Sequence, residues 1–216
     1  MESVRWPLVT VDLDGTLTRR HGWETIADRL GRRPLFDRAN ERYLAGEAGE
    51  DQHLFELLSI ATGAKLTDVV AALAATPHLD GIEDGIGRLH AAGRRIALLT
   101  HNPSYVVDWY VARFGFDDAE GTRSQVIVDG VVAPPGPTHA GKVDGLHALA
   151  ARAGVALDQV VHVGDGAVDA ALFPLVGGGI ALNAARPDVE RAADVVLRTI
   201  DFRDVVAATE RLRPRA

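Results

Sequence analysis

The pattern of apolar and polar positions divides the chain into two parts. Short runs rich in β-branched residues begin near residue 8 and recur later, at 95–100, 160–163, 179–182 and 195–197. Runs of this length without alternation are typical of strands buried on both faces of a parallel sheet. A helix-like segment precedes each run after residue 80, and alternating helix and strand indicates an α/β fold. We therefore predict a Rossmann-like, doubly wound parallel sheet.

The segment between residues 17 and 79 has a different pattern, because its apolar residues recur at helical spacing and no run is typical of a strand. Four glycines and Pro34 divide it into four short helices, and Thr76-Pro77 ends the last of them. We predict two domains: an α/β core formed by 1–16 and 80–216, and a small helical domain, 17–79, inserted after the first strand.

Two further elements are expected before the second half of the core. Residues 125–132 contain Asp129-Gly130 between two β-branched runs, which is a strong signal for a β-hairpin. The stiff, proline-rich segment 133–137 separates this hairpin from a helix that we predict over 141–153.

Composition limits the chemistry. The net charge of −7 argues against broad nucleic-acid binding, which needs clustered Lys and Arg, and favours a small ligand. The chain has no cysteine, so a thiolate nucleophile and a zinc–thiolate site are excluded, and oxygen-ligated metals such as Mg²⁺ are the main option.

The beginning of the chain lacks the pattern of a signal peptide, and its longest apolar stretches are far shorter than the ~20 residues of a membrane span. We expect a cytoplasmic protein without membrane association. The sequence leaves its oligomeric state open.

Two aspartates, Asp12 and Asp14, end the first strand in the motif Asp-Leu-Asp-Gly-Thr. Residues two apart lean to one face, and open α/β sheets bind ligands at the carboxyl ends of their strands. Such a carboxylate pair needs a cation or a shared proton, and it suits one group attacking phosphorus while the other transfers a proton. The alternative is an acidic turn that closes the strand.

A second acidic strand end has Asp165 and Asp169 four residues apart at the start of a helix. Helix N-capping alone would explain one of them. Thr100 ends another strand, where its hydroxyl can bind a phosphoryl oxygen. Lys142 lies near a helix start, where a cation is unfavourable unless an anion is close; a solvated surface lysine is the alternative.

Taken in order, Asp-Leu-Asp-Gly-Thr, Leu-Leu-Thr100, Lys142 and Gly-Asp165-Gly-Ala-Val-Asp169 resemble the four motifs of the haloacid dehalogenase-like hydrolases. The resemblance covers nearly the whole chain. The helical domain after the first motif looks like the cap of the phosphoserine-phosphatase-like branch. The resemblance therefore implies a phosphatase acting on a small phosphate monoester.

Carried over residue by residue, the resemblance implies that Asp12 is the nucleophile, forming an aspartyl phosphate, and that Asp14 is the acid and base. Thr100 and Lys142 would hold the phosphoryl group. Mg²⁺ would be bound by Asp12, by the Asp14 backbone carbonyl, by Asp165, and by Asp169 directly or through water. Phosphoryl transfer needs mainly positioning and charge neutralisation, which agrees with this assignment.

The chain departs from that branch at several positions. Thr100 is followed by His101-Asn102-Pro103 in place of Gly-Gly, and Val168 stands where Asn is common. The cap Glu that meets the substrate ammonium aligns with His21 or, after an insertion, with Glu24. The Arg that binds the substrate carboxylate would fall within 53–58, which has no Arg or Lys. These departures argue against phosphoserine and favour a less charged substrate, such as a sugar or polyol phosphate.

Candidate residues for contacts beyond the four motifs are His101 and Asn102, beside the phosphate site, and His21, Trp23, Glu24 and Phe55 in the cap. Trp23 and Phe55 lie at helical spacing among apolar neighbours, and the alternative is that they belong to the apolar core rather than to the substrate pocket. Asn102-Pro103 has helix capping as its alternative.

Three other functions are considered. A receiver-type signalling domain also uses an acidic strand end, a Thr and a Lys, but needs only about half this length and would lack the acid at Asp14. A binding module without activity is disfavoured because all the motif residues are present. A phosphotransferase or mutase, with an alcohol as the acceptor, is left open.

Overall fold

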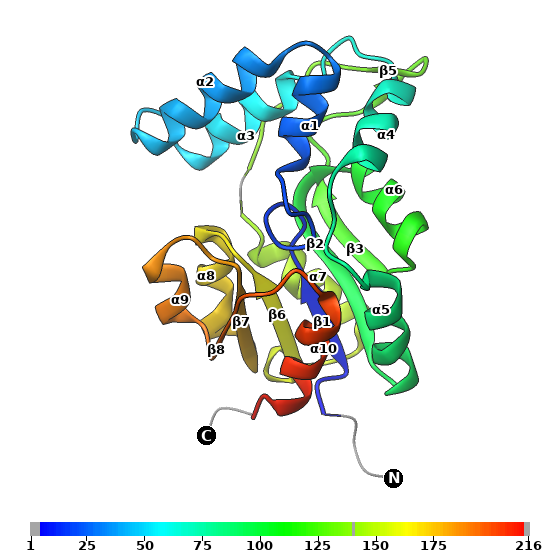
Figure 1. Cartoon of the computed structure of the whole chain (residues 1–216), viewed down its shortest axis with the longest axis vertical. Coiled ribbons are helices and arrows are strands. Elements are labelled where there is room, and N and C mark those ends of the chain that lie inside the picture. The colour runs from blue at the N-terminus through cyan, green and yellow to red at the C-terminus, as the bar shows by residue number, and fades with distance from the viewer. Residues whose placement is uncertain (1–4, 140, 214–216) are drawn as a thin grey trace.

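The core of the protein is a six-stranded parallel sheet. The computed structural model describes residues 5–139 and 141–213. Residues 1–4 and 214–216, at the two ends of the predicted core, and residue 140 lie outside the described residues. The strand order is β3-β2-β1-β6-β7-β8, and every pairing is parallel (Figure 1). The strands are β1 (Leu8–Val11), β2 (Arg95–Pro103), β3 (Asp118–Thr122), β6 (Val160–Gly164), β7 (Gly178–Leu182) and β8 (Val195–Leu197). The predicted fold class is confirmed.

Helices cover both faces of the sheet because successive strand residues point to opposite sides. Val9 and Val11 of β1 belong to one apolar cluster, whereas Leu8 belongs to another. The first cluster is covered by α5 (Ile82–Ala91), α6 (Ser104–Phe114) and α10 (Phe202–Arg211), and the second by α7 (Val143–Ala153) and α8 (Ala167–Leu172). Helix α9 (Pro187–Ala192) and two 3₁₀ turns (Leu157–Gln159, Phe173–Leu175) complete the core.

The inserted segment forms four helices at one end of the molecule, above the sheet (Figure 1). They are α1 (Gly22–Arg29), α2 (Arg33–Leu44), α3 (Glu50–Ser59) and α4 (Leu66–Ala75). Pro34 occupies the first turn of α2, where a missing N–H costs nothing, and α4 ends directly before Thr76. The predicted four helices are therefore present, and we call them the cap.

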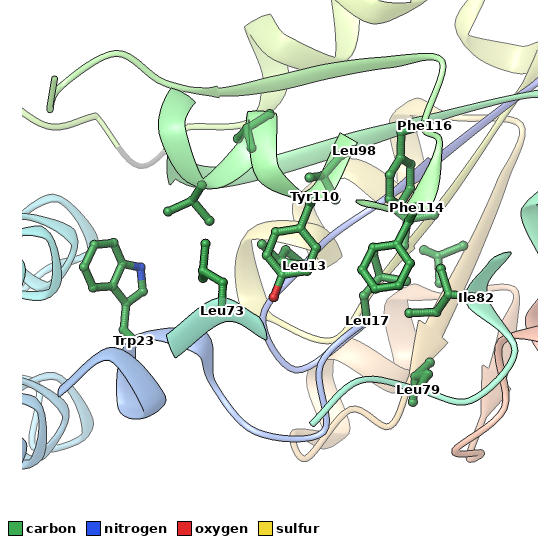
Figure 2. Close-up of a cluster of buried hydrophobic side chains, with 14 of the residues drawn as sticks. Leu13, Leu17, Trp23, Leu73, Leu79, Ile82, Leu98, Tyr110, Phe114 and Phe116 are labelled. Carbon is green, nitrogen blue, oxygen red and sulfur yellow. The ribbon is translucent and has the colours of Figure 1, made fainter. Parts of the chain in front are cut away.

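One apolar cluster extends from the sheet into the cap. Trp23 of α1 and Leu73 of α4 belong to the same buried cluster as Leu13 and Tyr110, and Figure 2 shows them in line with the aromatic residues beside the sheet. Burial of apolar surface at about 25 cal/mol per Å² is the main source of stability. The cap is thus packed onto the core rather than joined to it only by its two connections.

The predicted hairpin is formed by β4 (Ile127–Val128) and β5 (Val131–Val132). Asp129 and Gly130 both have positive φ angles, 49° and 77°, as a two-residue hairpin turn of this type requires. The hairpin binds the cap: the amide of Leu66 donates to the Gly130 carbonyl at 2.9 Å. A segment that lies between β3 and β6 in sequence therefore supports the cap in space.

Strand β3 has no counterpart among the predicted strands. Its sequence Asp-Ala-Glu-Gly-Thr contains no apolar run, and it lies at the edge of the sheet. Arg152 of α7 holds it there, with Nε 2.8 Å from Asp118 Oδ2 and Nη1 2.5 Å from Glu120 Oε1.

Among the described helices, none is long and apolar enough to cross a membrane.

Gln125 is the polar residue that joins the hairpin, the cap and α6. It is buried, its Nε2 donates to the carbonyls of Leu58 and Ala133 at 2.9 Å each, and its Oε1 accepts from Tyr105 Oη at 2.7 Å. We predict that Gln125→Leu lowers the free energy of unfolding by about 2–4 kcal/mol, because it removes three hydrogen bonds and leaves the Tyr105 hydroxyl and the Ala133 carbonyl without a partner among the described residues, whereas the Leu58 carbonyl still accepts from the Ala61 amide.

Urea unfolding measures this loss. The matched variant Tyr105→Phe removes only one of the three bonds, and we expect it to cost about 1 kcal/mol. Equal losses for the two variants would contradict the proposed role of Gln125.

Candidate active site

The predicted site residues meet at the carboxyl edge of the sheet. Val11 pairs with Leu98 of β2 and with Val163 of β6, so the residues that follow these strands lie together. A cavity of about 350 Å³ opens there between the sheet and the cap. Its lining includes all six residues of the predicted motifs, Asp12, Asp14, Thr100, Lys142, Asp165 and Asp169.

Lys142 is buried between two carboxylates. Its Nζ lies 2.6 Å from Asp12 Oδ1 and 2.8 Å from Asp169 Oδ1, and 5% of the residue is exposed. Burial acts to lower the pKa of Lys142, but the two carboxylates raise it by more. The surface-lysine alternative is therefore wrong, and Lys142 is a charged group inside the site.

The two carboxylates that Lys142 contacts differ in pKa. Burial raises the pKa of Asp12 well above its usual value; Lys142 opposes the rise, and Asp169 and Asp165 add to it. Burial also acts to raise the pKa of Asp169, but Lys142 and His162 lower it to well below the usual range. One lysine does not offset the charge of the surrounding aspartates.

Asp165 lies against the turn that follows the first strand. Thr16 Oγ1 donates to Asp165 Oδ1 at 2.7 Å. Gly15, with φ of +84°, permits this approach, because a Cβ atom there would lie 2.4 Å from Asp165 Oδ2. Burial and then the charge of Asp169 raise the pKa of Asp165 to about 6. Gly15 of the first motif is thus needed to leave space for the Asp165 carboxylate of the fourth motif.

A divalent cation fits this arrangement. One carboxylate oxygen from each of Asp12, Asp165 and Asp169 lies within 4.8 Å of the others. The donors are all oxygen, as Mg²⁺ prefers, and the raised pKa values of Asp12 and Asp165 indicate negative charge that a cation would offset. The Asp14 side chain is not in this group; the resemblance assigns its backbone carbonyl to the metal.

Asp14 is held on the other side of the cavity. Its Oδ1 accepts from the Gly22 amide at 2.6 Å, and its Oδ2 accepts from Asn102 Nδ2 at 2.7 Å. The same Nδ2 donates to Thr100 Oγ1 at 2.9 Å, and Asn102 Oδ1 accepts from Trp23 Nε1 at 2.9 Å. Asn102 thus uses both N–H groups within the protein and links Thr100, Asp14 and the cap.

His162 extends the buried network, and the sequence reasoning did not identify it. The ring is fully buried in β6, with Nε2 3.1 Å from Asp169 Oδ1 and Nδ1 2.9 Å from Thr10 Oγ1. Burial lowers its pKa although Asp169 opposes this, so the ring is neutral at pH 7. A neutral ring that donates a hydrogen bond from Nε2 to Asp169 can accept a hydrogen bond from the Thr10 hydroxyl at Nδ1.

Asp169 also caps α8, since the Gly166 amide donates to its Oδ2 at 2.9 Å. Asp169 occupies N3 of α8 and Gly166 is the N-cap residue, and this contact is compatible with the network because Oδ1 is the atom that contacts Lys142 and His162. Gly164 provides the necessary space, because a Cβ atom there would lie 2.2 Å from Asp169 Cγ.

The cap residues predicted to contact substrate divide into two groups. His21 and Trp23 line the cavity, as does His101 of the core. Glu24 and Phe55 are not among the lining residues: Glu24 is paired with Arg20 and Arg33, and Phe55 is 38% exposed. The cap instead contributes residues that the sequence reasoning missed, namely Asn40, Tyr43, Leu44, Glu50, His53, Leu54 and Leu57.

Comparison with known families identifies the group to which this site belongs. The model of the haloacid dehalogenase-like hydrolases matches residues 6–177. The chain belongs to the haloacid dehalogenase-like hydrolase family. The resemblance inferred from the motifs is confirmed.

Relatives of this hydrolase differ in length. A phosphoserine phosphatase of Streptomyces coelicolor is 28% identical over 92% of this chain, but the chain spans only 49% of that relative. A phosphoserine phosphatase of Methanocaldococcus jannaschii is 24% identical over 92% of this chain and 95% of its own length. A phosphoglycolate phosphatase of Halobacterium salinarum is 27% identical, with 96% and 97% of the two chains covered.

Solved structures support the fold of this hydrolase. A phospho-aspartyl intermediate analogue of a phosphoserine phosphatase superposes with a TM-score of 0.81 over 94% of this chain and 99% of the other, at 24% identity. A hydrolase of the same superfamily from Salmonella enterica superposes with a TM-score of 0.82 over 92% and 70% of the two chains, at 21% identity. At these identities, the similarity concerns the fold alone.

The contacts of His162 generate a prediction for this hydrolase. We expect His162→Ala to lower the free energy of unfolding by about 2–4 kcal/mol in metal-free buffer, because it leaves a cavity and removes one donor from buried Asp169. Urea unfolding with EDTA present measures the change. His147→Ala, on the exposed side of α7, is the control, and an equal midpoint for the two variants would contradict the prediction.

Proposed function

We propose that this protein is a Mg²⁺-dependent phosphomonoester hydrolase that forms an aspartyl phosphate on Asp12. The observation that carries the proposal is the buried Lys142 ammonium between Asp12 and Asp169, at the base of a cavity that also contains Asp14 and Thr100. Phosphoryl transfer needs a positioned nucleophile and positive charge around the transferring group. The arrangement supports both.

The proposed reaction has two displacement steps. A carboxylate oxygen of Asp12 attacks phosphorus, the bond from phosphorus to the ester oxygen breaks, and Asp14 gives that oxygen a proton. Asp14 then takes a proton from water, which attacks the aspartyl phosphate and releases inorganic phosphate. Lys142 holds Oδ1 of Asp12 and so fixes the direction of its carboxylate, while Thr100 and Lys142 bind phosphoryl oxygens.

Asp12, Asp165 and Asp169 would hold the Mg²⁺, together with the Asp14 backbone carbonyl. The bound ion would offset the negative charge on the phosphoryl oxygens. The Asn102 amide orients Asp14 through Oδ2, which keeps the acid at a fixed position relative to Thr100.

We propose that the leaving group of the substrate carries no carboxylate. Seven relatives are named phosphoserine phosphatases, and phosphoserine has a carboxylate that needs a cationic partner. Among the described residues that line the cavity, none is arginine, Lys142 is already paired with two aspartates, and His21 Nδ1 lies 3.4 Å from the carboxylate of Asp14. A buried carboxylate without a partner is strongly unfavourable. The residues that line the cavity therefore favour a substrate that is a small phosphate monoester other than phosphoserine.

One prediction of this mechanism concerns the proposed nucleophile, Asp12. We expect Mg²⁺-dependent release of phosphate from p-nitrophenyl phosphate, and a loss of at least about a thousandfold in kcat/KM for Asp12→Asn, because the amide cannot attack phosphorus. Asp84→Asn, an exposed carboxylate on α5, is the control. Full activity of Asp12→Asn would overturn the mechanism.

The products identify the final acceptor. Equal amounts of p-nitrophenol and inorganic phosphate indicate water. A shortfall of inorganic phosphate when an alcohol is added would indicate the phosphotransferase that the sequence leaves open.

The second prediction concerns the substrate carboxylate and compares phosphoserine with phosphoethanolamine, which differs by that group alone. We expect kcat/KM for phosphoethanolamine to equal or exceed that for phosphoserine. The reason is that, among the described residues, the cap contributes no lysine or arginine to the cavity lining that could pair with the carboxylate of phosphoserine. A preference of about tenfold or more for phosphoserine would contradict this proposal.

A further inference from the structure

Four residues of the cap form a connected wall of the cavity, which we call the polar wall: Asn40 and Tyr43 of α2, and Glu50 and His53 of α3. His53 Nε2 lies 2.8 Å from Asn40 Oδ1, and Tyr43 Oη donates to Glu50. The Tyr43 and His53 rings are stacked, with centroids 4.4 Å apart and planes 8° apart. The contacts join α2 to α3 and fix the direction of these side chains.

The two rings of the polar wall are uncharged at neutral pH. Burial lowers the pKa of His53 to about 4, and the electrostatic effect of nearby His21 adds to this. Burial, together with the bond to Glu50, raises the pKa of Tyr43 to about 12. A neutral His53 that donates from Nε2 to Asn40 has an unprotonated Nδ1. That nitrogen accepts no hydrogen bond from any described residue.

The side chains of the polar wall, which line the cavity, therefore carry both kinds of hydrogen-bonding group. His53 Nδ1 is an acceptor, and the Asn40 amide nitrogen is a donor without a partner among residues 5–139 and 141–213. Leu54 and Leu57 lie beside them in the lining. Hydroxyl groups on a carbon chain match such a surface, since each hydroxyl both donates and accepts while the carbon atoms pack on apolar side chains.

Charged leaving groups match the polar wall less well. A carboxylate finds no unpaired cation in the lining. An ammonium group could approach Glu50, but the Asn40 amide donors would then face a group without acceptors.

We propose that the polar wall selects an uncharged, hydroxylated leaving group, that of a sugar or polyol phosphate, with Asn40 and His53 as the specificity-determining residues. This inference rests on the proposed phosphomonoesterase activity. The cavity volume of about 350 Å³ lies in the range of small-molecule sites, and a small polyol phosphate is a suitable occupant.

The test uses three phosphates of similar size and one reference. Glycerol 3-phosphate has two neutral hydroxyls, 3-phosphoglycerate has a carboxylate in place of one hydroxymethyl group, and phosphoethanolamine has an ammonium. The reference is p-nitrophenyl phosphate, which has no hydroxyl. For the unmodified protein with Mg²⁺, we expect kcat/KM for glycerol 3-phosphate to exceed that for both charged compounds by about tenfold or more.

Variants assign this preference to the wall. His53→Phe keeps a ring stacked on Tyr43 but removes both nitrogens, and Asn40→Leu keeps the size of the side chain but removes the amide. We expect each to lower the ratio of kcat/KM for glycerol 3-phosphate to that for p-nitrophenyl phosphate by about tenfold, mainly through KM. Gln52→Ala, exposed on the same helix and outside the lining, is the control and leaves the ratio unchanged.

The outcomes separate the two proposals. If the unmodified protein does not hydrolyse p-nitrophenyl phosphate, the proposed function fails. If it does, but a charged compound is preferred or the variants lower kcat/KM for all substrates equally, the assignment of the polar wall is overturned. Circular dichroism of each variant excludes unfolding as the cause of a change.

Discussion

A single buried ammonium group organises the active edge of the sheet. An isolated charge inside a protein is costly, so Lys142 is stable only because Asp12 and Asp169 contact it, and their carboxylates in turn need its charge. Asp169 is fixed from the other side by His162 and by the Gly166 amide. The position of Asp12, the proposed nucleophile, therefore depends on β6, α7 and α8 as well as on β1. Asp165 adds a third carboxylate that one lysine does not balance, and this excess of negative charge is what makes the site suitable for a divalent cation.

The second half of the site is a hydrogen-bond network that crosses from the core to the cap. Asn102 contacts Thr100, Asp14 and Trp23, so the same amide positions the hydroxyl proposed to bind phosphate and the carboxyl group proposed as the acid. Trp23 belongs to the apolar cluster that extends from the cap to the sheet (Figure 2). Packing of the cap and orientation of Asp14 are thus coupled, because a cap displaced from the core would lose the Trp23 bond to Asn102.

The core and the four motif segments were predictable because each depends on local signals. β-branched runs predict buried strands, and parallel pairing brings their carboxyl ends together whatever the loops do. Strand β3 was not predictable, because an edge strand held by Arg152 has no apolar pattern. His162 was missed since its role depends on Asp169, seven residues later, docking against it. In the cap, helical periodicity predicts four helices but not their rotation, which decides that His53 faces the cavity while Phe55 does not.

This difference in predictability follows from how the two parts of the site are built. The charged part comes from strand ends and helix starts, where backbone geometry limits the positions of the side chains. The polar wall comes from the C-terminal half of α2 and the first turn of α3, and its side chains are fixed by one another through the Asn40–His53 bond and the Tyr43–His53 stack. Changing such a pair alters the hydrogen-bonding surface without moving Lys142 or Asp12, which the core alone positions. Leaving-group selection can therefore change while phosphoryl chemistry is retained, and in this chain the wall lacks a cation that could pair with a carboxylate.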